Sequence, residues 1–147
     1  MLGKKHQKPL TAVEGGTTLI ARDTTIMGDI VFSGNLDVEG RVIGSIIAEP
    51  GKDALLRILD GGEMEGEVRV PAAIVNGKVD GDLHVSGRIE LAECAHINGE
   101  VFYKLIEMAV GCKVEGGLHY VDSVSEGATE QRKAEPASAP PSKWQYQ

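Results

Sequence analysis

The stretch Ile89-Glu90-Leu91-Ala92-Glu93-Cys94-Ala95-His96-Ile97-Asn98-Gly99-Glu100-Val101 recurs, without a gap, as Ile106-Glu107-Met108-Ala109-Val110-Gly111-Cys112-Lys113-Val114-Glu115-Gly116-Gly117-Leu118. A third copy, from Leu56 to Val68, falls into the same register. The core of the repeat is an aliphatic residue, any residue, Gly, any residue and a second aliphatic residue. This core recurs around six marker glycines, Gly28, Gly44, Gly66, Gly81, Gly99 and Gly116. Such self-similarity predicts a solenoid, in which each repeat stacks on the next.

The spacing of the marker glycines predicts the kind of coil. Successive glycines are 16, 22, 15, 18 and 17 residues apart by their numbers, and the long interval contains Glu49-Pro50-Gly51-Lys52-Asp53, which we interpret as a turn insertion. A period of about 17 residues is too short for a pair of helices. Because β-forming residues alternate within it, as in Leu83-His84-Val85, we expect an all-β fold, a single β-helix of about six coils.

The alternation also separates interior from surface. Strand side chains have a period of two, so the first and third residues of Val101-Phe102-Tyr103 point one way and the middle residue points the other way. The apolar set is expected inside, where each buried aliphatic side chain contributes ~1.5–3 kcal/mol. The marker glycines are expected at corners that need positive φ or have no room for a side chain. Two interior columns are predicted: Ile20, Ile58, Leu91 and Met108, and Ile26, Val42, Met64, Val79, Ile97 and Val114.

Composition divides the chain and limits its function. Residues 1–16 and 123–147 are predicted to be disordered tails, and residues 17–122 form the repeat domain. A net charge of −7 argues against nucleic acid as a partner, because phosphate binding needs a basic face. No apolar run is long enough for a membrane span or a signal peptide, so we expect a cytoplasmic protein. Cys94 and Cys112 are expected to be reduced thiols.

The histidines do not predict a metal or catalytic site. His84 and His119 occupy equivalent positions two coils apart, which at ~4.8 Å per coil is too far for one zinc ion. His96 aligns with Glu63 and Lys113, so its position is a polar, outward one. The row Asp29, Glu67, Asp82 and Glu100, each after a marker glycine, is interpreted as a solvated acidic face rather than a cation site. We expect no cofactor, no metal and no catalytic residues.

The ends of the solenoid predict self-assembly. Neither Leu19-Ile20 at the first coil nor Leu118-His119-Tyr120 at the last has a capping element beside it, and two uncapped ends can bury each other and propagate as a filament. Phe102 is a further exposed apolar residue by alternation, with a local packing role as the alternative. The expected polymer interface comprises Leu19, Ile20, Leu118, Tyr120 and Phe102.

The N-terminal residues predict membrane contact. Met1 to Lys8 contains three lysines and no acidic residue, and Leu2 lies beside Lys4 and Lys5. An apolar residue next to a basic cluster is a weak anchor for an anionic bilayer, which many copies in a filament would strengthen. A plain solvated segment is the alternative.

The repeat domain, with its glycine-marked coils and flanking tails, resembles the bactofilins, which are bacterial polymer-forming cytoskeletal proteins. The resemblance implies a right-handed β-helix that polymerises head to tail without nucleotide, binds the inner membrane through a segment like Met1-Leu2-Gly3-Lys4-Lys5, and positions cell-wall enzymes. It also implies that Tyr120, beside Leu118, is the bulky last-coil residue of the polymer contact. Trp144 and Tyr146 depart from the pattern and are either a docking motif or without a role. The alternative function is a trimeric β-helical enzyme, an acyltransferase or one resembling γ-carbonic anhydrase.

Overall fold

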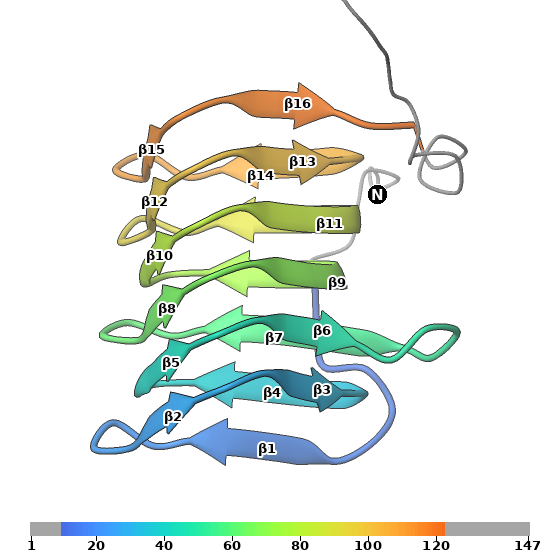
Figure 1. Ribbon diagram of the computed structural model, residues 1–147. Coiled ribbons are helices and arrows are strands. Elements are labelled where there is room, and N and C mark those ends of the chain that lie inside the picture. The colour runs from blue at the N-terminus through green and yellow to red at the C-terminus, as the bar shows by residue number, and fades with distance from the viewer. Residues whose placement is uncertain (1–9, 123–147) are drawn as a thin grey trace, which may run out of the picture.

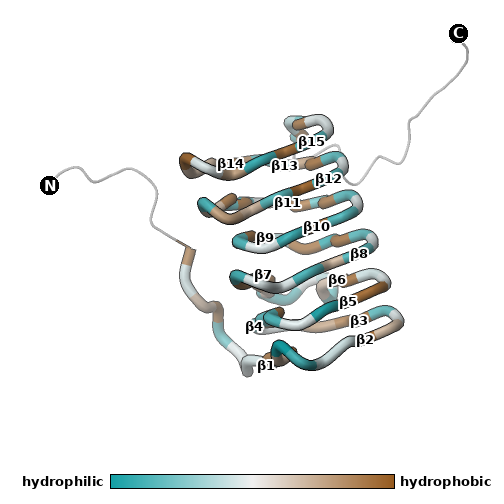
Figure 2. The backbone as a smooth tube through the Cα atoms, turned by 90° about the vertical axis from the view of Figure 1, so that its left-hand side faces the viewer, coloured by the Kyte–Doolittle hydropathy of each residue, from teal (hydrophilic) through white to brown (hydrophobic). Residues whose placement is uncertain are grey.

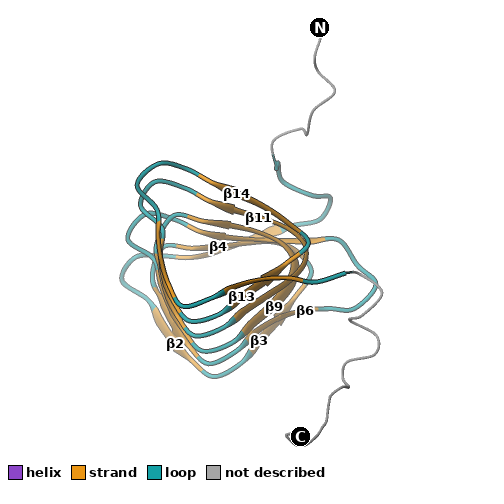
Figure 3. Ribbon diagram, turned by 90° about the horizontal axis from the view of Figure 1, so that it is seen from above, coloured by secondary structure: helices purple, strands orange, loops and turns teal. Residues whose placement is uncertain are grey.

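The computed structural model describes residues 10–122, which form parallel strands and no helix. The strands wind into six coils stacked along one axis (Figure 1), and each coil has three sides, so the solenoid is triangular when viewed along the axis (Figure 3). The prediction of an all-β solenoid of about six coils is therefore confirmed. The strand bounds are β1 Thr17–Ile20, β2 Thr25–Met27, β3 Ile30–Phe32, β4 Gly34–Val38, β5 Arg41–Ile43, β6 Ile46–Ala48, β7 Ala54–Ile58, β8 Glu63–Glu65, β9 Val68–Val75, β10 Lys78–Asp80, β11 Leu83–Leu91, β12 His96–Asn98, β13 Val101–Tyr103, β14 Leu105–Met108, β15 Lys113–Glu115 and β16 Leu118–Tyr120.

Each side of the solenoid is one face of parallel strands. Face 1 consists of β1, β4, β7, residues 72–75 of β9, residues 88–91 of β11, and β14. Face 2 is the six-stranded sheet of β2, β5, β8, β10, β12 and β15. Face 3 consists of β3, β6, residues 68–70 of β9, residues 83–85 of β11, β13 and β16. The long strands β9 and β11 turn from face 3 into face 1 of the next coil, with a register irregularity at the turn of β11.

The core is a set of aliphatic columns that run parallel to the axis. Both predicted columns are present: Ile20, Val38, Ile58, Val75, Leu91 and Met108 are successive register partners on face 1, and Ile26, Val42, Met64, Val79, Ile97 and Val114 are partners on face 2. Their members in the middle coils are fully buried. Burial of these side chains is the main source of stability, because the narrow interior contains little else.

The marker glycines form a corner column that requires glycine for two reasons. Gly66 has a φ of 135°, a region that residues with a Cβ rarely adopt. A Cβ at Gly66 would also lie 1.9 Å from the carbonyl oxygen of Gly44 in the coil before. The repeated glycine therefore permits adjacent coils to approach closely at the corner.

Two segments leave the regular winding. The predicted insertion, residues 49–53, is a turn that protrudes between β6 and β7 (Figure 1). Residues 10–16, part of the predicted N-terminal tail, run along the outside of the solenoid past β7 and β4 to β1 (Figure 2). We call residues 10–16 the strap. The backbone N–H and C=O of Val13 both bond to the side-chain amide of Asn35, at 2.9 Å each.

Candidate polymerisation surface

The last coil exposes side chains that belong to the core columns. Leu118, Met108 and Tyr120 are 41%, 47% and 66% exposed, whereas interior residues of the third coil such as Ile58 and Val68 are 0% exposed. The exposure arises because, among residues 10–122, no coil follows β14, β15 and β16 (Figure 1). An end of this kind presents apolar side chains together with unpaired strand edges, so the C-terminal end of the solenoid is open.

The first coil is the complementary end of the same columns. Its interior positions are Thr18, Ile20, Ile26, Ile30 and Phe32, and their register partners lie on one side only, in the second coil. Ile20 is 6% exposed, and Ile26 and Ile30 are half-buried. The strap passes beside this coil along face 1 and does not cross its end (Figure 2). The column that begins at Thr18 ends at Ile106, the column from Ile20 ends at Met108, and those from Ile26 and Ile30 end at Val114 and Leu118.

The structure divides the five predicted interface residues into two groups. Leu118 and Tyr120 line the open last coil, and Ile20 belongs to a core column of the first coil. Leu19 is exposed but points outward from face 1, because it is the register partner of Asp37. Phe102 also points outward, on face 3. The alternation therefore identified the column residues but did not separate an open end from an outer face.

Phe102 has the local packing role that was its alternative interpretation. Its ring stacks between the rings of His84 and His119, with centroids 4.6 Å and 4.7 Å away. His84 and His119 are two coils apart, as their sequence positions predict, and Phe102 fills the coil between them. This stack covers the outside of face 3 near the last coil.

One arginine–carboxylate ion pair and two histidine–carboxylate contacts connect the last coil to the coil before it, one on each face. Arg88 Nη2 lies 2.9 Å from Glu107 Oε2 on face 1. On face 2, His96 Nε2 lies 3.2 Å from Glu115 Oε2, and on face 3, His119 Nε2 lies 2.6 Å from Glu100 Oε1. The pairs hold a coil whose interior side chains have neighbours on one side only.

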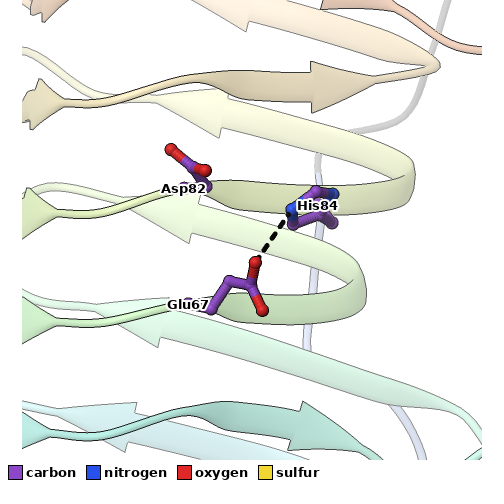
Figure 4. Close-up of side chains that lie close together, drawn as sticks. All are labelled: Glu67, Asp82 and His84. Atoms are coloured by element: carbon purple, nitrogen blue, oxygen red, sulfur yellow. Dashed lines mark ion pairs between the residues drawn. The ribbon is translucent and has the colours of Figure 1, made fainter. Parts of the chain in front are cut away.

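Glu67, Asp82 and His84 form the cluster best suited to a metal ion within residues 10–122. One potential ligand atom from each residue lies within 4.8 Å of the other two, and His84 Nε2 is 3.5 Å from Glu67 Oε2 (Figure 4). Glu67 also pairs with Arg69, and Asp82 accepts a hydrogen bond from the backbone N–H of Glu100. Desolvation by burial, assisted by the charge of Arg69, lowers the pKa of His84. The carboxylates thus already have protein partners.

Sequence reasoning missed part of the polymerisation surface. Met108, Val114 and Ile106 lie at the open end with Leu118 but were not among the predicted interface residues. Met108 and Val114 are the last members of the two predicted columns, and this position could have identified them as residues of the open end. The strap had no comparable signal, because residues 10–16 have no repeat and no alternation.

Several predicted features lie outside the described residues. These are the membrane-binding residues Leu2, Lys4 and Lys5, and the C-terminal pair Trp144 and Tyr146. Cys94 and Cys112 are free thiols. Between residues 10 and 122 there is no helix with the length and hydropathy needed to cross a bilayer.

A family of known proteins matches the chain over the coils described above. The family model described as "Bactofilin: Polymer-forming cytoskeletal" matches residues 18–119, from the first strand to the last. No curated protein and no solved structure matches the chain. The match covers most of the chain and all six coils, and we conclude that this protein is a member of the bactofilin family of polymer-forming cytoskeletal proteins.

Proposed function

We propose that this protein is a cytoskeletal scaffold whose copies stack end to end, the last coil of one on the first coil of the next, into filaments that need no nucleotide. The open last coil is the observation that supports this most strongly. Its column residues Leu118, Met108 and Tyr120 pack against the coil before them but remain exposed on their other side, and a second copy that covers them would remove this apolar surface from water.

The columns favour head-to-tail order. A first coil placed on a last coil puts Thr18 after Ile106, Ile20 after Met108 and Ile26 after Val114, so each core column continues into the next copy. The strands at the junction then pair in parallel, as they do throughout the chain. Such a heterologous contact does not close on itself and generates a polymer.

The proposal places these filaments at the inner face of the cytoplasmic membrane, with Leu2, Lys4 and Lys5 as the anchor. Each lysine near an anionic leaflet contributes about 1 kcal/mol, which is weak for a single copy. A filament binds through many copies, so its avidity far exceeds that of one anchor. At the membrane the polymer would position cell-wall remodelling and morphogenesis proteins, consistent with the cytoskeletal family to which the chain belongs.

Sedimentation and electron microscopy of the purified chain, without nucleotide, test the assembly. We expect the protein to pellet and to form filaments whose axial repeat is one six-coil solenoid, roughly 29 Å at ~4.8 Å per coil. A protein that sediments as a monomer, or as the closed trimer that a β-helical enzyme would form, would exclude the scaffold.

A further inference from the structure

The strap fixes where the chain enters the solenoid. Leu10, its first residue, donates its backbone N–H to Glu90 Oε2 at 3.3 Å, on face 1 of the fifth coil. Val13 is held by the Asn35 side chain, whose amide also donates to the carbonyl of Gly16 at 3.3 Å. The described part of the chain therefore begins on the outside of face 1.

The strap is part of the packing of face 1. Leu55 is the register partner of Asn35 and points outward, yet it is 0% exposed and lies outside the interior cluster. Asn35 is 2% exposed, and its side chain bonds to strap backbone alone. Buried polar side chains are normally hydrogen-bonded, and the partners of Asn35 all belong to the strap. Leu55, beside Asn35, points outward and is still shielded from solvent. Both observations indicate that the strap is docked on face 1 in the folded protein.

The charges of the outer surface differ from face to face. On face 1, the Arg57 guanidinium forms a bidentate ion pair with the Asp37 carboxylate, with N···O distances of 2.7 and 2.8 Å. Arg88 Nη2 lies 2.9 Å from Glu90 Oε2 and 2.9 Å from Glu107 Oε2. The edge between faces 2 and 3 instead carries a row of carboxylates, Asp29, Glu67, Asp82 and Glu100. The turns between faces 1 and 2 form a second acidic edge, with Asp23, Glu39, Asp60 and Glu93, so the orientation depends on the strap and not on charge.

We infer that face 1 is the side of the filament that meets the membrane, held there because the strap delivers residues 1–9 to that face. The inference rests on the proposed anchor at Leu2, Lys4 and Lys5. An anchor in residues 1–9 pulls on the solenoid where the chain is docked, at Leu10 on face 1, so this face is drawn toward the bilayer. Stacking that continues the columns keeps face 1 of successive copies on one side, and faces 2 and 3 stay open to protein partners.

Depth-dependent quenching tests this orientation. In a chain carrying Cys94→Ser and Cys112→Ser, a single bimane label is attached to Leu105→Cys on face 1, Asn98→Cys on face 2 or Val31→Cys on face 3, all exposed positions. The labelled polymers are bound to vesicles of phosphatidylglycerol and phosphatidylcholine that contain a nitroxide lipid. We expect quenching at Leu105 to be several-fold stronger than at Asn98 or Val31.

Two control variants separate the anchor from the orientation. Deleting residues 1–8 should abolish both vesicle binding and quenching, while Asn35→Ala should release the strap, retain binding and reduce the difference between the three labels. If the polymer binds and the label at Asn98 or Val31 is quenched as strongly as that at Leu105, the orientation is wrong although the anchor stands. If the full chain does not bind the vesicles, the proposed anchor and the orientation both fail.

Discussion

Tyr120 lies one coil beyond Tyr103 and meets it edge to face, with the ring centroids 6.3 Å apart at an interplanar angle of 71°, and yet Tyr120 is 66% exposed. Within the part of the chain that the structure describes, Tyr103 has a coil on each side, whereas Tyr120 has one only on its N-terminal side. The pair shows within a single column how an interior position becomes a surface position where the solenoid ends. This exposed end is the basis of the proposed polymer contact.

Tyr120→Arg should leave a folded protein that no longer pellets. The side chain is exposed in the single copy, so the substitution should change the free energy of unfolding by about 0.5 kcal/mol or less. At a coil-to-coil junction the same charge would be desolvated without a partner, at a cost of several kcal/mol. Val110→Arg is the matched control, because Val110 is the most exposed apolar residue of the same coil and lies in a turn. Unimpaired pelleting of the Tyr120 variant would remove this residue from the interface.

Ile20→Arg is a test of a different kind. Ile20 is 6% exposed in the single chain, so the arginine would disrupt the first coil itself as well as any junction. We expect loss of pelleting together with a loss of stability of several kcal/mol, measured by urea unfolding. An Ile20→Arg protein as stable as the wild type would show that this position is less enclosed than its column implies.

Gly66→Ala should be more damaging than Gly61→Ala. Both glycines have positive φ, 135° and 91°, which costs an alanine roughly 1–3 kcal/mol. A Cβ at Gly61 meets nothing within 4 Å, whereas at Gly66 it meets the backbone of Gly44 at 1.9 Å, and adjacent coils would have to separate. Urea unfolding of the two variants measures the difference. Equal destabilisation would mean that backbone conformation alone explains the glycine column.

The pH dependence of stability should be weaker in His84→Gln. The pKa of His84 is lowered, mainly by desolvation and also by the charge of Arg69. The folded protein therefore protonates His84 less readily than the unfolded chain does, in which a histidine has a pKa of about 6.5. The contribution of His84 to stability is therefore lost as the pH falls below about 6.5 and levels off below its lowered pKa. Wild type should lose more stability than the variant between about pH 7.5 and about pH 5.5. Parallel stability curves for the two proteins would contradict this assignment.

Replacing His84, His96 and His119 together by glutamine should leave the polymer intact and the metal content negligible. All three point outward, and glutamine keeps a polar group that can hydrogen-bond the carboxylates of Glu67, Glu115 and Glu100, so we expect each change to cost about 0.5 kcal/mol or less. Elemental analysis of the purified protein is the measurement. Stoichiometric zinc in the wild type that disappears in the variant would show that these histidines bind a metal and favour the enzyme alternative, and the single variant His84→Gln would then test the cluster of Glu67, Asp82 and His84.

The coils could be predicted from the sequence because the repeat imposes two local rules. Glycine marks each corner and apolar residues alternate, so the columns ending at Met108 and Val114 follow from alignment alone. The outer contacts could not be predicted in this way. The bond between Val13 and Asn35 and the covering of Leu55 depend on a segment that crosses several coils without a repeating pattern. Phe102 was visible as an outward residue, but its stack with two histidines requires the side-chain geometry.

Disulfide capture across the junction tests the central claim most directly. The native cysteines are first removed by Cys94→Ser and Cys112→Ser. Thr18→Cys and Ile106→Cys then place one cysteine at each end of the same column. If the last coil of one copy pairs with the first coil of the next, the Cα atoms of these two cysteines lie within the roughly 4.4–6.8 Å that a disulfide spans. We expect mild oxidation of the double variant to give a ladder of covalent oligomers, while each single variant stays monomeric and a mixture of the two gives dimers. Dimers of a single variant with itself would contradict the head-to-tail order, and a double variant that remains monomeric would contradict end-to-end assembly altogether.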